Sequence, residues 1–352
     1  MIGAGVSELT ELAESIFTSA AKDGDPAGGG VEDTGVDAAL WATLDQAGLA
    51  RLTLPEAVGG SAGTLIDAAA VLAAAGAHAA RVPLVETDLL AGWLLHAAGL
   101  AVPAGPLTAV AASLDVQPSG DGWVVRGELA RVPWARAAAG IAVLIGEQVV
   151  LLDPAAVTVT NGVNLAGEPR DRVVVDLAPG LIAGSSGGAA AELRLRAALG
   201  RALLLAGAAR GALALSVRYA GERVQFGRPI GRFQAVQQQL ALAAAEVAAA
   251  GMAAQAAAGA AERDGFGAGS TSFAIAAAKA RTSEAAGVVA RIAHQVHGAI
   301  GFTREHALRL LTTRLWAWRD EDGAEAEWQA ELGARVLGAG PDDLWPLLTG
   351  AP

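Results

Sequence analysis

Apolar side chains recur at helical spacing over most of the chain, but not in its middle. Up to about residue 100, leucines such as Leu40 and Leu44 lie one helical turn apart, and residues 66–100 form a long alanine-rich run. This pattern predicts helices. Over residues 101–184 it changes to short β-branched runs such as WVVRG, IAVLIG and RVVVDL, separated by Gly, Asn, Asp and Pro. That spacing favours antiparallel strands over alternating strands and helices.

Helical periodicity returns after a glycine-rich hinge at residues 183–188. Apolar residues four apart (Leu205, Ala209, Leu213 and Val217) predict the buried face of one long helix, and a third long helix is expected from about Ser272 to His297. Long helices with short connections form bundles. The pattern therefore predicts a mainly α, α+β multidomain protein. Its expected parts are an N-terminal helical domain (1–100), a middle antiparallel β domain (101–184) and a C-terminal helical bundle (185–352).

Composition narrows the class of protein. The chain has 352 residues, is 53% hydrophobic and carries a net charge of −11, so it can bury a large core but lacks the basic surface that nucleic acid requires. It contains no cysteine, and its first residues carry acids rather than the basic start of a signal peptide. The apolar run from Leu240 is mostly alanine and is interrupted by Glu246 and Gln255, which argues against membrane insertion. We therefore expect a cytoplasmic protein.

Two segments of the C-terminal region combine glycines with glutamine. ERVQFGRPIGRFQAVQQQLA starts at Glu222, and QVHGAIGFTREHALRLL starts at Gln295. Taken alone, the first segment is explained by a Gly-Pro chain reversal in which Arg223 caps the end of a helix. Together, the two segments resemble the C-terminal signature of the acyl-CoA dehydrogenase family. LWATLDQAGLARLTLPEAVGG, in the N-terminal region, is similar to another segment of that family.

The resemblance implies an N-terminal helical domain, a middle β domain, a C-terminal four-helix bundle and an FAD cofactor. It implies that the pyrophosphate and adenosine end of FAD contacts residues of both segments (Arg223, Phe226, Ile230 and Gln234; Gln295, Gly298 and Ala299). Ala299 stands where the family usually has glycine. The chemistry agrees, because guanidinium groups bind pyrophosphate and carboxamides bind ribose or adenine. In the family these contacts reach the flavin of a neighbouring chain, which implies a dimer or tetramer and a dimerisation role for the C-terminal bundle.

The resemblance also implies the reaction and its base. Family members remove an α-proton from an acyl-CoA with a carboxylate while a β-hydride passes to the flavin, which then reduces an electron-transfer acceptor. Gap-free alignment with the family places its catalytic Glu and the Gly that follows at Asp322 and Gly323 of this chain. The family's alternative position for the catalytic Glu is on the helix before the Arg223 turn. That position falls at Ala197 here, which has no carboxylate. Asp322 lies in the acidic run RDED, so a solvated surface turn is the competing interpretation. No metal site is expected, because His294 and His297 have no evident third ligand.

The middle domain departs from the family. Arg131, Val132 and Pro133 stand where a Trp-Ile-Thr strand would flank the flavin ring, and Trp134 follows them. Two hypotheses therefore remain open. In the first, the chain is an FAD-dependent acyl-CoA dehydrogenase with Asp322 as base. In the second, it is a catalytically degenerate subunit that completes the flavin site of a homologous partner chain.

Overall fold

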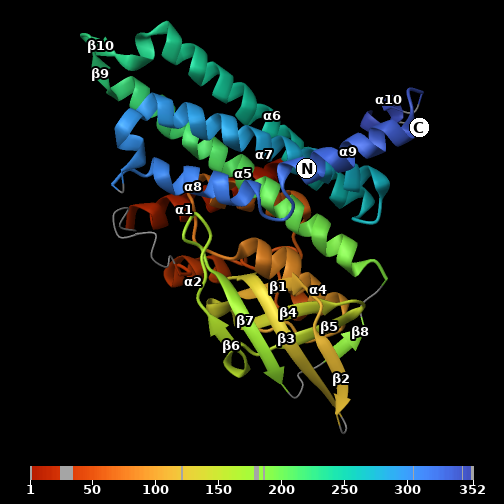
Figure 1. The fold of residues 1–352 in the computed structure, drawn as a ribbon. Coiled ribbons are helices and arrows are strands. Elements are labelled where there is room, and N and C mark those ends of the chain that lie inside the picture. Colours follow the sequence, from red (N-terminus) through yellow and green to blue (C-terminus); the bar gives the residue numbers. More distant parts are fainter. Residues whose placement is uncertain are drawn as a thin grey trace. The chain divides into compact units, whose positions relative to one another are not determined.

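The computed structural model describes residues 2–23, 35–119, 122–177, 182–184, 187–303, 305–342 and 344–349. Residues 185 and 186 of the expected hinge lie outside this part. The chain order is helices, then strands, then helices (Figure 1), as expected from the sequence. Contacts divide the chain into two compact units. The first comprises Met1–Glu14, Ala69–Ala79 and Ala198–Pro352, and the second comprises Ser15–Ala68 and Ala80–Ala197. The three-domain boundaries stay a prediction.

The N-terminal helices are shorter than the sequence pattern suggested. They are α1 (Ile2–Asp23), α2 (Ala38–Gln46), α3 (Leu65–Ala77), a π-helix (Val85–Gly92) and α4 (Trp93–Ala97), with a 3-10 turn at Glu56–Val58. The prediction of helix throughout residues 66–100 was therefore wrong. Ala79 has a left-handed φ of 52°, which ends the helical backbone, and Pro83 lacks the N–H that a helix would need.

The described residues between 107 and 184 form eight strands. They are β1 (Leu107–Ala111), β2 (Asp115–Ser119), β3 (Gly122–Pro133), β4 (Gly140–Ile145), β5 (Gln148–Leu152), β6 (Thr158–Thr160), β7 (Arg170–Leu177) and β8 (Ile182–Gly184). They form two sheets with the orders β1-β4-β5-β8 and β2-β3-β7-β6. All paired strands of these sheets are antiparallel except β1 and β4, which are parallel. The antiparallel expectation thus needs this one correction: the chain leaves β1, forms β2 and β3 in the other sheet, and returns as β4.

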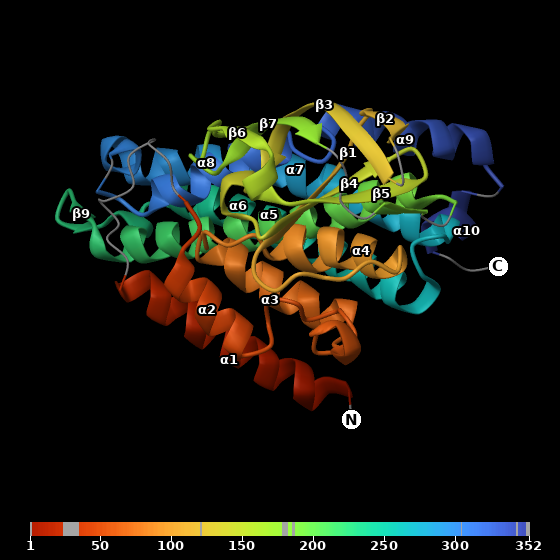
Figure 2. The ribbon, with the colours of Figure 1, turned by 90° about the horizontal axis from the view of Figure 1, so that it is seen from below.

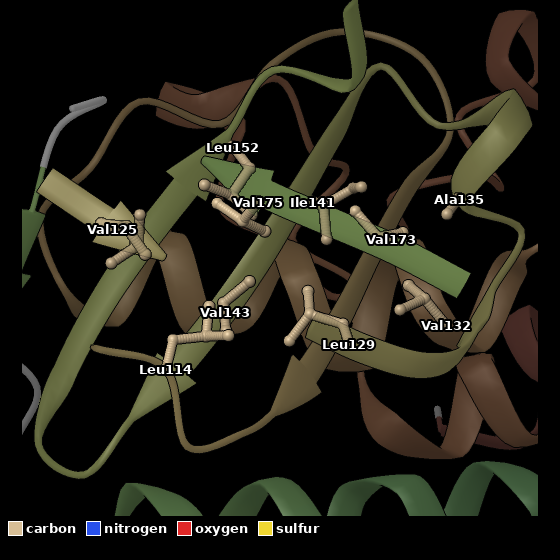
Figure 3. Packing of buried hydrophobic residues seen from close by; sticks show 11 residues of the cluster. Leu114, Val125, Leu129, Val132, Ala135, Ile141, Val143, Leu152, Val173 and Val175 are labelled. Atoms are coloured by element: carbon tan, nitrogen blue, oxygen red, sulfur yellow. The ribbon is translucent and has the colours of Figure 1, made fainter. Parts of the chain in front are cut away.

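The core of the β region draws on strands of both sheets. Figure 3 shows Val125 and Leu129 of β3 together with Val173 of β7 and Ile141 of β4, all buried. In a regular strand, Leu129 and Val132 would point to opposite faces of the sheet. A register shift in β3 between these two residues places both on the same face. Both ends of β3 therefore contribute side chains to one core.

The C-terminal helices are α5 (Ala189–Glu222), α6 (Gln234–Asp264), α7 (Gly269–His297), α8 (Leu308–Arg319), α9 (Glu325–Ala339) and α10 (Leu344–Thr349). α7 packs against α6, α8 and α9 and is the most buried of them. The predicted face of α5 is buried at Leu205 and Ala209 but open at Val217. By length and composition alone α5 and α6 are apolar enough to cross a membrane, a property shared by core helices of soluble proteins. Two-thirds of the apolar window of α5 is buried inside the protein.

α3 and α5 approach so closely that backbone touches backbone. A Cβ built on Gly207 would lie 2.1 Å from the Ala73 carbonyl oxygen, and one on Gly76 would lie 2.2 Å from the Leu204 carbonyl oxygen. Neither position accepts a side chain unless the helices separate. Glycine therefore sets the distance between these helices.

Gly207→Ala is expected to destabilise the protein by about 1–3 kcal/mol, because the new methyl group overpacks the contact with Ala73. Gly251→Ala in α6 is the matched control, because a Cβ there meets no atom within 4 Å. Removing a mid-helix glycine at that site should stabilise the protein by about 0.5–1 kcal/mol. Thermal unfolding of both variants measures the difference. Equal melting temperatures would contradict the close contact.

Candidate functional site

A tight hairpin connects α5 to α6. β9 (Val224–Gln225) pairs with β10 (Arg228–Pro229), and the two residues between them, Phe226 and Gly227, have φ values of 52° and 77°. A positive φ is unusual for a bulky residue, but a two-residue hairpin turn requires it at both central positions. The Phe226 side chain is 91% exposed and meets the Phe233 ring edge-on at a centroid distance of 6.0 Å. The hairpin therefore presents an aromatic side chain to the outside.

The predicted cofactor residues of the first segment lie around this hairpin. The Ile230 N–H donates to the Arg223 carbonyl oxygen at 2.8 Å, which closes the loop. Gln234 is the first residue of α6, and both it and Arg223 are exposed. Gly231 packs against the Ala220 carbonyl, where a Cβ would lie 3.1 Å away. Arg223, Phe226, Ile230 and Gln234 thus occupy one end of the bundle.

The second segment lies at the same end. The Tyr219 ring, in the last turn of α5, stacks on the ring of His297, the last residue of α7, with centroids 4.5 Å apart. Gln295, Gly298 and Ala299 surround His297 in the sequence and are exposed. Figures 1 and 2 show β9 at the end of the bundle where α7 turns towards α8. The structure therefore brings the two predicted segments to one end of one unit.

Histidine rings form aromatic stacks beside this end. His294 lies between Phe302 and Trp316, at centroid distances of 4.0 and 5.3 Å. Burial lowers the pKa of both His294 and His297 below the usual value. Within the described ranges, no group of three side chains could hold a metal ion. Burial therefore disfavours the charged form of both rings, which pack here as aromatic groups.

The remaining C-terminal tryptophans divide between core and surface. Trp318 and Trp328 are buried, whereas Trp345 is largely exposed. Trp318 and Trp328 therefore belong to the core, and Trp345 is the largely exposed member of these three tryptophans.

Asp322 sits in a turn that is fixed from several sides. It has a φ of 57°, and Gly323 follows at 93°. The Trp328 indole N–H donates to the Asp322 carbonyl oxygen at 3.1 Å, and a Cβ on Gly323 would lie 2.3 Å from that indole nitrogen. The turn therefore requires glycine at 323. The Asp322 carboxylate accepts a hydrogen bond at Oδ2 from Arg201 Nε at 2.8 Å.

Lys279 supports the same turn from inside the bundle. Its side chain is fully buried, and Nζ donates to the carbonyl oxygens of Gly323 and Arg319 at 2.8 and 3.0 Å. It also donates to Ser283 Oγ at 3.1 Å. Burial lowers the Lys279 pKa to about 8. Sequence reasoning missed this residue, although one signal was available: it is one of two lysines in a chain whose other 23 basic residues are arginine.

The positions that departed from the family pattern are occupied by packing residues. Trp134 has a φ of 56° and is buried, and its N–H donates to the Pro169 carbonyl oxygen at 3.2 Å. Arg131 lies in the bulged part of β3. Ala197 is buried and apolar. The nearest carboxylate along α5, Glu192, forms an ion pair with Arg196 at 2.8 Å.

A buried carboxylate that the sequence did not single out lies in the π-helix. Asp88 accepts hydrogen bonds from the Thr53 backbone N–H at 3.0 Å and from the Thr53 hydroxyl at 3.0 Å. Burial nevertheless raises the Asp88 pKa to about 7, against the hydrogen bonds and the charge of Arg196, which act in the opposite direction. The fold thus favours the protonated form of this group.

Asp88 is expected to make stability fall as pH rises from about 4 to about 7. In this range the unfolded chain has lost the Asp88 proton while the folded chain retains it, so unfolding is favoured increasingly. Three pH units correspond to on the order of 4 kcal/mol. The difference in unfolding free energy between Asp88→Asn and the unaltered protein should therefore change across this window. Thr53→Val removes one hydrogen-bond donor to the charged form of Asp88. It should therefore raise the Asp88 pKa further and extend this pH range upward. A pH-independent difference between Asp88→Asn and the unaltered protein would contradict the assignment.

Comparison with known proteins identifies the family. Residues 191–337 match the acyl-CoA dehydrogenase C-terminal domain. The acyl-CoA dehydrogenase IpdE2 of Mycobacterium tuberculosis is 31% identical over 325 residues, which cover 87% of this chain and 90% of that protein. The chain belongs to the acyl-CoA dehydrogenase family.

Solved structures of this family agree with the fold. The ChsE4-ChsE5 complex from Mycobacterium tuberculosis contains a chain with a TM-score of 0.84 and 23% identity, covering 96% of this chain and 98% of that one. The Tcur3481-Tcur3483 steroid acyl-CoA dehydrogenase, in a G363A variant, gives a TM-score of 0.82 with 26% identity, covering 96% and 99%. The predicted fold class is confirmed, and the family is one of flavoprotein oxidoreductases that act on acyl-CoA.

Proposed function

We propose that this chain takes part in the FAD-dependent α,β-dehydrogenation of an acyl-CoA thioester, with Asp322 as the base. The observation that carries the proposal is the Tyr219–His297 stack, because it joins the last turn of α5, which leads directly into the first segment, to the second segment at one end of the bundle. The two segments provide a guanidinium and carboxamides that can bind a dinucleotide. The fixed Asp322-Gly323 turn provides the carboxylate that can act as the base.

The residues present suit FAD. The exposed Arg223 guanidinium can donate two parallel hydrogen bonds to a pyrophosphate, and the exposed carboxamides of Gln234 and Gln295 can bind ribose or adenine. A Cβ on Gly227 or Gly298 would meet no atom within 4 Å, so the backbone there is open to a ligand. Ile230, Phe226 and Ala299 complete the proposed contacts.

In the proposed reaction, FAD and Asp322 have separate roles. Bound FAD supplies the oxidant that accepts the β-hydride. Asp322 accepts the α-proton as the α C–H bond breaks, and the electron pair of that bond forms the α,β double bond. The Trp328 and Lys279 hydrogen bonds hold the turn, so the carboxylate is oriented before substrate arrives.

A partner chain is part of the proposal. The hairpin exposes Val224 next to the proposed cofactor residues, and Phe226, one of those residues, is also exposed, as expected for a surface that a second chain covers. The partner is a second copy or a homologous subunit, in a dimer or tetramer, and an electron-transfer protein or comparable acceptor reoxidises the flavin. We expect the assembly in the cytoplasm.

The second candidate is a degenerate subunit that completes the flavin site of a homologous partner. Two observations favour it: Asp322 is already bound to Arg201, and Trp134 is buried as a packing residue. The ChsE4-ChsE5 neighbour is a complex of two named chains, which makes a heteromeric arrangement a reasonable comparison.

Flavin content and anaerobic bleaching test the proposal. The chain would be purified alone and after co-expression with a related chain from its own source. Butyryl-CoA, octanoyl-CoA and a steroid-derived acyl-CoA would then be added, the last because one structural neighbour is described as a steroid acyl-CoA dehydrogenase. Flavin bound by the chain alone, one per polypeptide, that bleaches with one of these thioesters supports the first candidate. A colourless chain that acquires flavin only with its partner supports the second.

A further inference from the structure

Arg201 is a buried guanidinium between two carboxylates. Its side chain is 4% exposed and lies on α5. Nε donates to Asp322 Oδ2 at 2.8 Å, and a terminal nitrogen lies 3.4 Å from Glu321 Oε2. The guanidinium carbon also lies 5.8 Å from the Trp318 ring centroid. These contacts connect Arg201 on α5 to residues that lie 117 to 121 positions further along the chain.

This arrangement matters when Asp322 changes charge. Leaving a buried charge without a partner is strongly unfavourable. If Arg201 were paired with Asp322 alone, uptake of a proton by Asp322 would leave the buried guanidinium without a counter-ion. Because Glu321 also lies within ion-pair distance of Arg201, Arg201 keeps one counter-ion after Asp322 becomes neutral. The buried ammonium of Lys279 is nearby and is held separately by the Gly323 and Arg319 carbonyl oxygens.

The geometry also leaves one oxygen of Asp322 available. Arg201 binds Oδ2, and within the part of the chain that is described no residue forms a hydrogen bond with Oδ1. Trp328 and Lys279 fix the backbone on either side. The carboxylate is therefore held by one oxygen, and the other can face a substrate.

We infer that Arg201 is a positioning residue for Asp322 and that Glu321 is the counter-ion that balances Arg201 when Asp322 takes up the substrate α-proton. In this step the α C–H bond breaks, an O–H bond forms at Asp322 Oδ1, and the Arg201 charge remains neutralised by Glu321. The electron pair enters the α,β double bond as the β-hydride leaves to the oxidised flavin. The inference rests on the proposed function with Asp322 as base.

Glu321→Gln in the flavin-loaded complex is the primary test, because it keeps the side-chain shape and removes the charge. We expect kcat to fall about tenfold to a hundredfold with KM changed less than about threefold, because the loss arises in the proton-transfer step. Exchange of the substrate α-proton with deuterated water should slow in parallel, with butyryl-CoA or octanoyl-CoA as the probe. Glu321→Asp, which keeps the charge, should recover part of both rates.

Asp320→Asn is the matched control, since this neighbouring carboxylate is 70% exposed and pairs with Arg319 instead. It should leave kcat, KM and exchange unchanged. Arg201→Lys should retain more activity than Arg201→Met, with thermal melting and flavin content checked for both variants. If Glu321→Gln behaves like Asp320→Asn in turnover and exchange while Asp322→Asn is inactive, the counter-ion role is overturned and the proposed function stands. If Asp322→Asn itself keeps full turnover, the base assignment fails, and this inference fails with it.

Discussion

Asp322→Asn is expected to reduce acyl-CoA turnover by about 10²–10⁴-fold, because the amide cannot accept the α-proton that the reaction must remove. The variant should keep its fold: the amide oxygen can still accept from Arg201 Nε, and the backbone contacts of Trp328 and Lys279 do not involve the substituted group. Flavin content should therefore be unchanged. Steady-state turnover and the rate of anaerobic flavin bleaching measure the effect.

The Asp322 result discriminates between the two candidate functions. Asp320→Asn, two residues earlier, provides the control for removing an acidic charge from the same run. If Asp322→Asn bleaches its flavin as fast as the unaltered complex, the base lies elsewhere. The second candidate, a subunit that completes a partner's flavin site, would then be the better account.

Arg223→Met is expected to weaken FAD binding by about thirtyfold or more. A charged hydrogen bond to an anion contributes roughly 1.5–3 kcal/mol, and a guanidinium can form two such bonds with a pyrophosphate. Arg223→Lys should lose less, because the charge remains while the paired geometry is lost. Equilibrium dialysis of apoprotein, alone or with its partner chain, against FAD measures the dissociation constant.

Arg232→Met is the control for the loss of one positive charge. Arg232 is exposed in the same loop but is outside the proposed cofactor set. If Arg223→Met and Arg232→Met weaken FAD binding equally, general surface charge explains the effect. If neither variant weakens binding, the hairpin does not contact the pyrophosphate.

The long helices were predictable because their signal is local. The third long helix was expected at about residues 272–297 and begins at Gly269, and the chain reversal at residues 223–233 was also expected. The break after α3 was missed because alanine-rich sequence is equally apolar on every face. The parallel β1–β4 pair was missed because local alternation does not specify which strand a segment pairs with.

The candidate site was predictable only in part for a related reason. Arg223 and Gln295 lie in recognisable glycine-bearing segments, so their sequence context identifies them. Arg201 lies in a leucine-rich helix, and its partner Asp322 is 121 residues away. Pairing over such a distance is set by tertiary packing, and nothing in the local sequence of α5 distinguishes Arg201 from its neighbouring arginines.

The burial of Lys279 has a practical consequence for chemical labelling. Since Lys22 is the only other lysine in the chain, amine-directed reagents and lysine acetyltransferases have few side chains to modify. Lys279 has no exposed surface, and two of its hydrogen bonds hold the turn, at the carbonyl oxygens of Arg319 and Gly323. Acylation of Lys279 requires that turn to open first, so the rate at which this single amine is labelled reports how often the Asp322 loop detaches from the bundle.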